Sequence, residues 1–173
     1  MEIADMIRYT AFAFALVLCL PAFGGESPAK RLFIIERSLN SNMVVYDANV
    51  VPGSFFNRVR PVDAYWIMRE QDSRREELNY VEKRRAYGFD IEPVREGSHY
   101  RIALRSFRQR TISVVLENNR PRAIIDINGR RSYLSRIFIA TGGSSLFPVV
   151  NHVELFGIDT ANGERLREKI TGR

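Results

Sequence analysis

Six short runs with strand patterns, separated by turn sequences, follow one another from Phe89 onward, and they constrain the fold most. In the clearest run, Tyr100, Ile102 and Leu104 alternate with less apolar residues, the period-2 pattern of a half-buried strand. Asn128-Gly129 is a strong hairpin signal because both residues tolerate a positive φ. The predicted strands cover residues 89–95, 100–105, 111–117, 122–127, 132–140 and 146–156. Connections this short favour antiparallel neighbours, since parallel pairing needs a long crossover.

Three further strands and one helix are predicted upstream, the strands at 32–38, 42–48 and 61–70. The helix is expected from Ser73 to about Tyr87. Ser73 and Glu76 have the spacing of a capping box, and Gly88 suits a helix end. The fold class is therefore mainly β, with about nine strands and one helix. A lipocalin-like up-and-down antiparallel barrel is preferred because closure removes exposed edges, and a sandwich is the alternative.

The N-terminal segment has the pattern of a cleaved signal peptide. Residues 11–20 form an unbroken apolar run, long enough for a signal peptide and too short to span a membrane. Arg8 precedes the run, and Ala22-Phe23-Gly24 fits a cleavage site. Glu2 and Asp5 make the first residues acidic, so a start at Met6 instead of Met1 is a second hypothesis. An uncleaved anchor and a lipoprotein acylated at Cys19 remain alternatives.

The predicted organisation is thus a signal peptide at 1–24, an antiparallel β domain at 25–159 and a polar C-terminal tail at 160–173, loose or forming a short helix. The protein is expected to be exported, to the periplasm or outside the cell. Cys19 is the one cysteine, so the mature chain would have no disulfide and no thiolate metal site. No transmembrane segment is expected after cleavage.

The formal net charge of +6 comes almost entirely from arginine. Such a charge suits an anionic small molecule, an anionic envelope component or nucleic acid. The arginines are scattered along the chain, and no nucleic-acid-binding motif accompanies them, so no nucleic acid is expected as a partner. Scattered arginines on a solvated face are the simplest interpretation.

No motif indicates a catalytic or metal site. His152-Val153-Glu154 lacks the cysteine pair that a zinc deaminase needs, and the two side chains share a strand face, where they can pair. Gly142-Gly143-Ser144-Ser145 predicts a hairpin turn, because a serine-hydrolase elbow needs a second glycine and a following helix. No cofactor, no metal and no catalytic residue is therefore predicted.

One group of residues is the candidate ligand-binding site, because aromatic rings beside arginine and asparagine suit a pocket with apolar walls and a few polar groups. The alternative is ordinary packing, with Trp66 in the core and Asp63 paired to an arginine. The candidate residues are Arg37, Asn40, Asn42, Tyr46, Asp63, Tyr65 and Trp66.

Three stretches together resemble a known family. Phe-Ile-Ile-Glu-Arg-Ser-Leu-Asn at 33–40 leads into Val-Val-Tyr-Asp at 44–47, followed by Pro-Val-Asp-Ala-Tyr-Trp-Ile at 61–67 and by the segment 77–88. They resemble a bacterial family of exported proteins classed only as a domain of unknown function, number forty-eight thirty-three. The resemblance covers nearly all of the mature chain and implies a single-domain envelope or secreted protein. It implies no activity and supplies no site residues.

Three functions remain open. The first is a non-enzymatic envelope or secreted binding module that holds an apolar or anionic small molecule. The second is a structural or interaction domain with a packed core that meets an anionic envelope partner. The third is a hydrolase. Small inward residues would favour the first, whereas inward Leu, Ile and Phe would favour the second. The ligand, the partner and the oligomeric state do not follow from the sequence.

Overall fold

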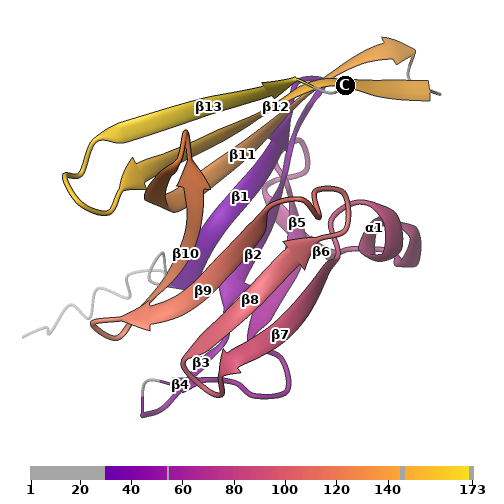
Figure 1. The fold of residues 1–173 in the computed structure, drawn as a ribbon. Coiled ribbons are helices and arrows are strands. Elements are labelled where there is room, and N and C mark those ends of the chain that lie inside the picture. The colour runs from indigo at the N-terminus through magenta and orange to yellow at the C-terminus, as the bar shows by residue number, and fades with distance from the viewer. Residues whose placement is uncertain (1–29, 54, 145–146, 172–173) are drawn as a thin grey trace, which may run out of the picture.

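The computed structural model describes residues 30–53, 55–144 and 147–171, and nearly all of these residues belong to strands or the turns between them (Figure 1). The first half of the chain contains β1 (Arg31–Arg37), β2 (Asn40–Ala48), β3 (Val50–Val51), β4 (Phe55–Phe56), β5 (Val62–Met68), β6 (Arg74–Glu77) and the helix α1 (Tyr80–Arg85). The second half contains β7 (Phe89–Arg95), β8 (His99–Leu104), β9 (Thr111–Glu117), β10 (Arg120–Ile127), β11 (Arg130–Ser144), β12 (Phe147–Asp159) and β13 (Arg165–Thr171). The mainly β class is confirmed.

All nine predicted strands are present, and two of them, β7 and β9, have the predicted ends. The β10–β11 hairpin turns at Asn128-Gly129, where both residues have a positive φ, as the sequence predicts. β11 differs from its prediction, because it runs through Gly142 and Gly143, where a turn is expected. Local turn chemistry therefore locates most strands, but two glycines in a row do not always end one.

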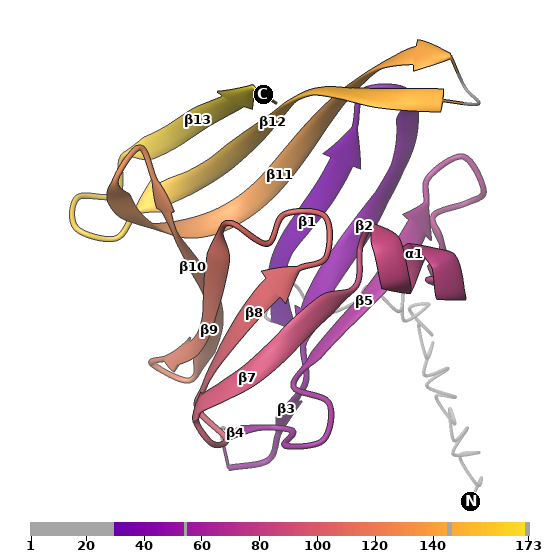
Figure 2. The same cartoon turned by 45° about the vertical axis from the view of Figure 1, so that its right-hand side comes forward.

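The long strand β11 joins the two halves of one curled sheet. Eleven strands form this sheet, in the order β6-β5-β2-β1-β11-β10-β9-β8-β7, with β12 and β13 added beyond β11. The first part of β11 pairs with β10, and its later part pairs with β1. β12 pairs with β11 along nearly its whole length. The strands therefore diverge from β11 as two wings, β1-β2-β5-β6 and β10-β9-β8-β7, which Figure 2 shows facing each other.

One pairing contradicts the expectation of an antiparallel sheet. β1 and β11 are parallel, with Ile35 beside Ile137 and Arg37 beside Ile139. The short-connection argument holds for strands that are neighbours in sequence, whereas nearly the whole domain lies between β1 and β11. Within the described residues the end strands β6 and β7 do not pair, so the sheet is a half-barrel, intermediate between the predicted barrel and sandwich.

The space between the two wings is filled with large side chains. Phe33 of β1 and Tyr46 of β2 stack with their ring centroids 4.4 Å apart, and both are fully buried. Ile102 and Ile112 of the opposite wing are fully buried as well. At about 25 cal/mol per Å² of apolar surface, this burial is the main force holding the wings together. The centre of the half-barrel is therefore a packed core.

The predicted helix over residues 73–87 is wrong in its first half. Residues 74–77 form strand β6, which pairs with β5. Ser73 has a φ of 56°, whereas an N-cap residue needs an extended backbone, so Ser73 and Glu76 form no capping box. The capping box is formed instead by Asn79 and Glu82 at the start of α1. The positive φ of Asp72 and Ser73 reverses the chain so that β6 can return along β5.

The C-terminal tail is a strand, not a loose segment or a short helix. β13 pairs with β12 from His152 to Ile158, so the sheet extends beyond the boundary predicted at residue 159. Leu166 and Ile170 are the inward positions of an alternating pattern, and they pack against the core. The charged residues Arg167, Glu168 and Lys169 between them hide this period-2 signal, although Glu168 is half-buried and pairs with Arg110. The predicted signal peptide at 1–24 lies outside the described residues, and no helix in the described part is long and apolar enough to cross a membrane.

Candidate functional site

Four of the seven candidate residues line one polar cleft of about 220 Å³ between the ends of β1, β2 and β5, strand β6 and the start of α1. These four are Arg37, Asn40, Asn42 and Trp66. The lining of the polar cleft is completed by Met68, Glu76, Glu77, Asn79 and Glu82. The structure thus brings four of the seven predicted residues together, and β6 and α1 contribute side chains that the prediction does not include.

Arg37 lines the polar cleft and lies against two aromatic rings. Its guanidinium carbon is 5.4 Å from the ring centroid of Trp66 and 5.7 Å from that of Tyr87. The two rings contact each other edge to face, with centroids 5.1 Å apart. Such contacts hold a cation in place without neutralising its charge. Arg37 Nε is buried and has no hydrogen-bond partner within the described part of the chain.

The two candidate asparagines use their side-chain oxygens to shape the β2 end of the polar cleft. Asn40 Oδ1 accepts a hydrogen bond of 2.7 Å from the backbone N–H of Asn42. Asn42 is buried, and its Oδ1 accepts a hydrogen bond of 3.4 Å from the backbone N–H of Glu70. Because the oxygens are occupied, the amide nitrogens of both side chains remain as donors.

Tyr46 lies beneath this cleft, in the core rather than in its lining. Its hydroxyl donates a hydrogen bond of 2.5 Å to the backbone carbonyl of Tyr87. Complete burial raises the pKa of Tyr46 well above its usual value. Tyr46 therefore holds in place the segment that carries the Tyr87 ring. Its effect on the polar cleft is indirect, through the position of that ring.

Asp63 and Tyr65 lie on the opposite face of β5 from Trp66, as the alternation along a strand requires. The Tyr65 hydroxyl donates a hydrogen bond of 2.6 Å to Asp47, and Arg75 lies 3.7 Å from the centroid of the Tyr65 ring. Asp63 accepts a hydrogen bond of 2.8 Å from Asn49 and forms an ion pair with Arg60. Pairing with an arginine is the alternative that the sequence suggests for Asp63. These two residues do not reach the polar cleft.

A second cavity, which the sequence interpretation misses, is an apolar groove of about 510 Å³ next to the edge of β1 that pairs with β11. Its walls come from β1, β11, β12, β13 and the loop after β8. The apolar lining is Ile35, Leu104, Phe107, Ile137, Ile139, Val150, Val153 and Ile170, and the polar lining is Ser106, Gln109 and Thr171. The period-2 pattern of residues 165–171 is the sequence signal that could have predicted this groove, because β13 forms one of its walls.

His152 and Glu154 pair as their shared strand face predicts, with His152 Nε2 3.1 Å from Glu154 Oε1. Arg167 of β13 donates to both oxygens of the same carboxylate, at 3.0 and 2.6 Å. Hydrogen bonding from Arg167 is the main cause of the lowered pKa of Glu154. This cluster ties β13 to β12. No group of three or more potential metal-ligating side chains occurs in the described ranges.

Comparison with known proteins identifies a family for this chain but no activity. A family model described as "Domain of unknown function (DUF4833)" matches residues 33–169, which is most of the chain. No curated protein and no solved structure shows a significant match.

Proposed function

The chain belongs to the DUF4833 family of domains of unknown function, and we propose that it is a non-enzymatic binding module that holds a small apolar molecule in the apolar groove. The observation that carries this proposal is the composition of the groove, whose walls are aliphatic and aromatic apart from three polar side chains. Its volume of about 510 Å³ falls in the range of small-molecule sites, roughly 300–1,000 Å³.

The position of the groove also supports a binding role. The packed core lies between the wings, whereas the groove lies beside it, where β11, β12 and β13 extend past the second wing. Half-buried side chains such as Ile139, Val153 and Ile170 pack against the core and also line the groove. An apolar occupant would complete the burial of these side chains, worth about 25 cal/mol per Å² of apolar surface removed from water.

Export is part of the proposal. The apolar run at residues 11–20 and the small residues Ala22 and Gly24 have the pattern of a signal peptide. A binding module exported by such a signal peptide would act in the periplasm or outside the cell. An apolar molecule is poorly soluble in water there, and a binding protein would keep it in solution.

The test measures displacement of N-phenyl-1-naphthylamine, a neutral fluorescent probe, by a series of linear alcohols. If the groove holds the chain, affinity rises up to roughly fourfold for each added CH₂, as expected for about 0.8 kcal/mol per buried methylene. Ile170→Asp, which places a charge in the groove, is expected to abolish binding. Ile158→Asp is the matched control, since Ile158 is 41% exposed on the adjacent strand and does not line the groove. Equal binding by both variants would contradict the proposal.

A second candidate, a structural domain that meets an anionic envelope partner, is favoured by one observation: the centre of the half-barrel is filled with large side chains. The arginine distribution argues against it. Many arginines form ion pairs with carboxylates of the same chain, which reduces the charge they present to a partner. Those with such a pair are Arg31, Arg58, Arg60, Arg69, Arg74, Arg75, Arg105, Arg108, Arg110, Arg130, Arg136 and Arg167. Binding of the protein to anionic vesicles at physiological salt would favour this candidate.

A further inference from the structure

We infer that the ligand of the apolar groove carries a carboxylate group and that Arg37 binds it, so that the ligand is an amphiphile with its head in the polar cleft. This inference rests on the proposed function, because the groove must hold the apolar part. It names the chemistry of the other end of the ligand, which the groove alone does not specify.

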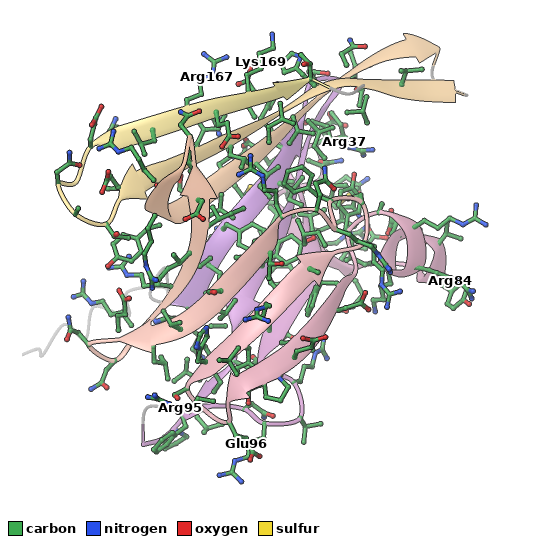
Figure 3. All side chains as sticks on the ribbon, in the orientation of Figure 1. Arg37, Arg84, Arg95, Glu96, Arg167 and Lys169 are labelled. Atoms are coloured by element: carbon green, nitrogen blue, oxygen red, sulfur yellow. The ribbon has the colours of Figure 1, made fainter. Side chains whose placement is uncertain are left out.

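Each of the two cavities has one lining residue on β1. Ile35 lines the apolar groove and Arg37 lines the polar cleft, and the two residues lie on the same face of β1 because they are two positions apart. Their Cα atoms are therefore roughly 7 Å apart. Arg37 is also the register partner of Ile139, another groove residue, on β11. Figure 3 shows Arg37 at the end of β1 that lies under β11 and β12. A chain that leaves the groove along β1 thus reaches Arg37 within a few atoms.

Arg37 is a charge without a counter-charge. No carboxylate of the described residues forms an ion pair with it, and its buried Nε has no hydrogen-bond partner. Three glutamates line the same cleft, but each is engaged elsewhere. Glu76 pairs with Arg74 at 3.5 Å, and Glu82 accepts the backbone N–H of Asn79 at 2.8 Å. Leaving a partly buried charge unpaired is unfavourable, and a ligand carboxylate would relieve it.

The third glutamate, Glu77, is surrounded by cations. It lies 3.6 Å from Arg75, 3.7 Å from Lys83 and 3.9 Å from Arg60. Arg74 therefore offsets the charge of Glu76, and Arg75 and Lys83 offset the charge of Glu77. This pairing reduces the repulsion that these two carboxylates exert on an anion beside Arg37.

The donor set suits a carboxylate. A guanidinium presents two parallel N–H groups that match the two oxygens of a carboxylate. Asn40 and Asn42 line the same cleft, and their side-chain amides can add neutral donors. The rings of Trp66 and Tyr87 hold the guanidinium in place, so little conformational entropy is lost on binding. Because three glutamates line the cleft, a singly charged head is favoured over a doubly charged phosphate.

The experiment measures the affinity of the full-length protein for laurate, dodecanol and dodecyl phosphate, all below their aggregation concentrations, with N-phenyl-1-naphthylamine as the displaced probe. We expect laurate to bind at least about tenfold more tightly than dodecanol, because a charge-assisted hydrogen bond contributes about that much or more. Arg37→Gln should make the two affinities equal within about twofold. Arg69→Gln is the matched control, since Arg69 is a nearby exposed arginine outside both cavities, and it should keep the preference.

Trp66 gives a second readout, because it is the one tryptophan of the chain and contacts Arg37. Its emission should change on addition of laurate and not on addition of dodecanol. Equal binding of laurate and dodecanol by the wild type would overturn the inference and leave the proposed function intact. Tighter binding of dodecyl phosphate than of laurate would overturn the assignment of a carboxylate. Binding of none of the three would overturn the proposed function and the inference together. The wild-type comparison decides these outcomes even if Arg37→Gln fails to fold.

Discussion

The hydrogen bond from Tyr46 to the carbonyl of Tyr87 links the core to the polar cleft, and its removal is the most informative perturbation of the fold. The Tyr46 hydroxyl is fully buried and lies 2.5 Å from the carbonyl oxygen. Tyr46→Phe keeps the ring that stacks on Phe33 and removes one oxygen atom. The carbonyl of Tyr87 then has no replacement partner among the described residues.

The expected loss follows from that geometry. A typical hydrogen bond contributes about 1 kcal/mol net, and a buried acceptor left unpaired costs about 1–3 kcal/mol. We therefore expect Tyr46→Phe to lower the free energy of unfolding by about 2 kcal/mol. For a domain of this size, that loss lowers Tm by roughly 4–8 °C. Tyr46→Ala also removes the ring and should cost about 3–5 kcal/mol.

Urea denaturation followed by circular dichroism measures the loss. The matched control is Tyr80→Phe, because the Tyr80 hydroxyl also forms a hydrogen bond, at 2.6 Å from Arg84, but Tyr80 is 71% exposed. Water replaces that partner, so a change below about 0.5 kcal/mol is expected. Equal losses in the two variants, or no loss in Tyr46→Phe, would refute the assignment of Tyr46 to the buried core.

Three further predictions concern single residues away from the core centre. Gly157→Ala places a Cβ 2.6 Å from the carbonyl oxygen of Tyr133, so β11 and β12 must separate, and urea denaturation should show a loss of about 1–3 kcal/mol. Asn79→Ala removes the N-cap of α1 and should cost about 1 kcal/mol in the same assay. The pKa of Glu154 is lowered in the folded state, chiefly by Arg167, so its stabilisation is present at neutral pH and is lost as pH falls below about 4.5. Glu154→Gln should therefore lower Tm at pH 7 and make Tm fall less between pH 6 and pH 3, and parallel Tm–pH curves for variant and wild type would contradict this account.

Much of the fold follows from local patterns. Alternation and turn residues place β7 to β12 nearly where they lie, because most of these strands bury alternate residues and each meets the next through a short connection. The partner of β1 could not be found this way. Its parallel pairing with β11 joins residues about a hundred positions apart, and no local signal specifies such a contact.

Two errors have a common cause, which is charge on one face of a strand. Residues 74–77 are all exposed, and residues 165–171 bury only alternate positions, so both segments look like polar surface. Tertiary pairing with β5 and with β12 overrides that composition. The apolar groove was missed for the same reason, since β13 is one of its walls.

Four of the seven candidate residues lie together in the structure. Arg37, Asn40, Asn42 and Trp66 converge because β1, β2 and β5 are neighbours, which their spacing in sequence suggests. Tyr65 lies on the other face because one step along a strand reverses the side chain. The carboxylates of the polar cleft come from segments assigned to one long helix, so their place beside Arg37 could not be foreseen.

The most direct test of the central claim is native mass spectrometry of the protein purified from the envelope or medium of its own host, followed by denaturing mass spectrometry of the same sample. The account predicts a discrete mass excess that vanishes on denaturation, and the released molecule should be an apolar compound with a carboxylate. The denatured mass also gives the N-terminus of the mature chain. A bare mass, unchanged after incubation with an extract of envelope lipids, would contradict the binding-module account and leave a packed interaction domain in its place.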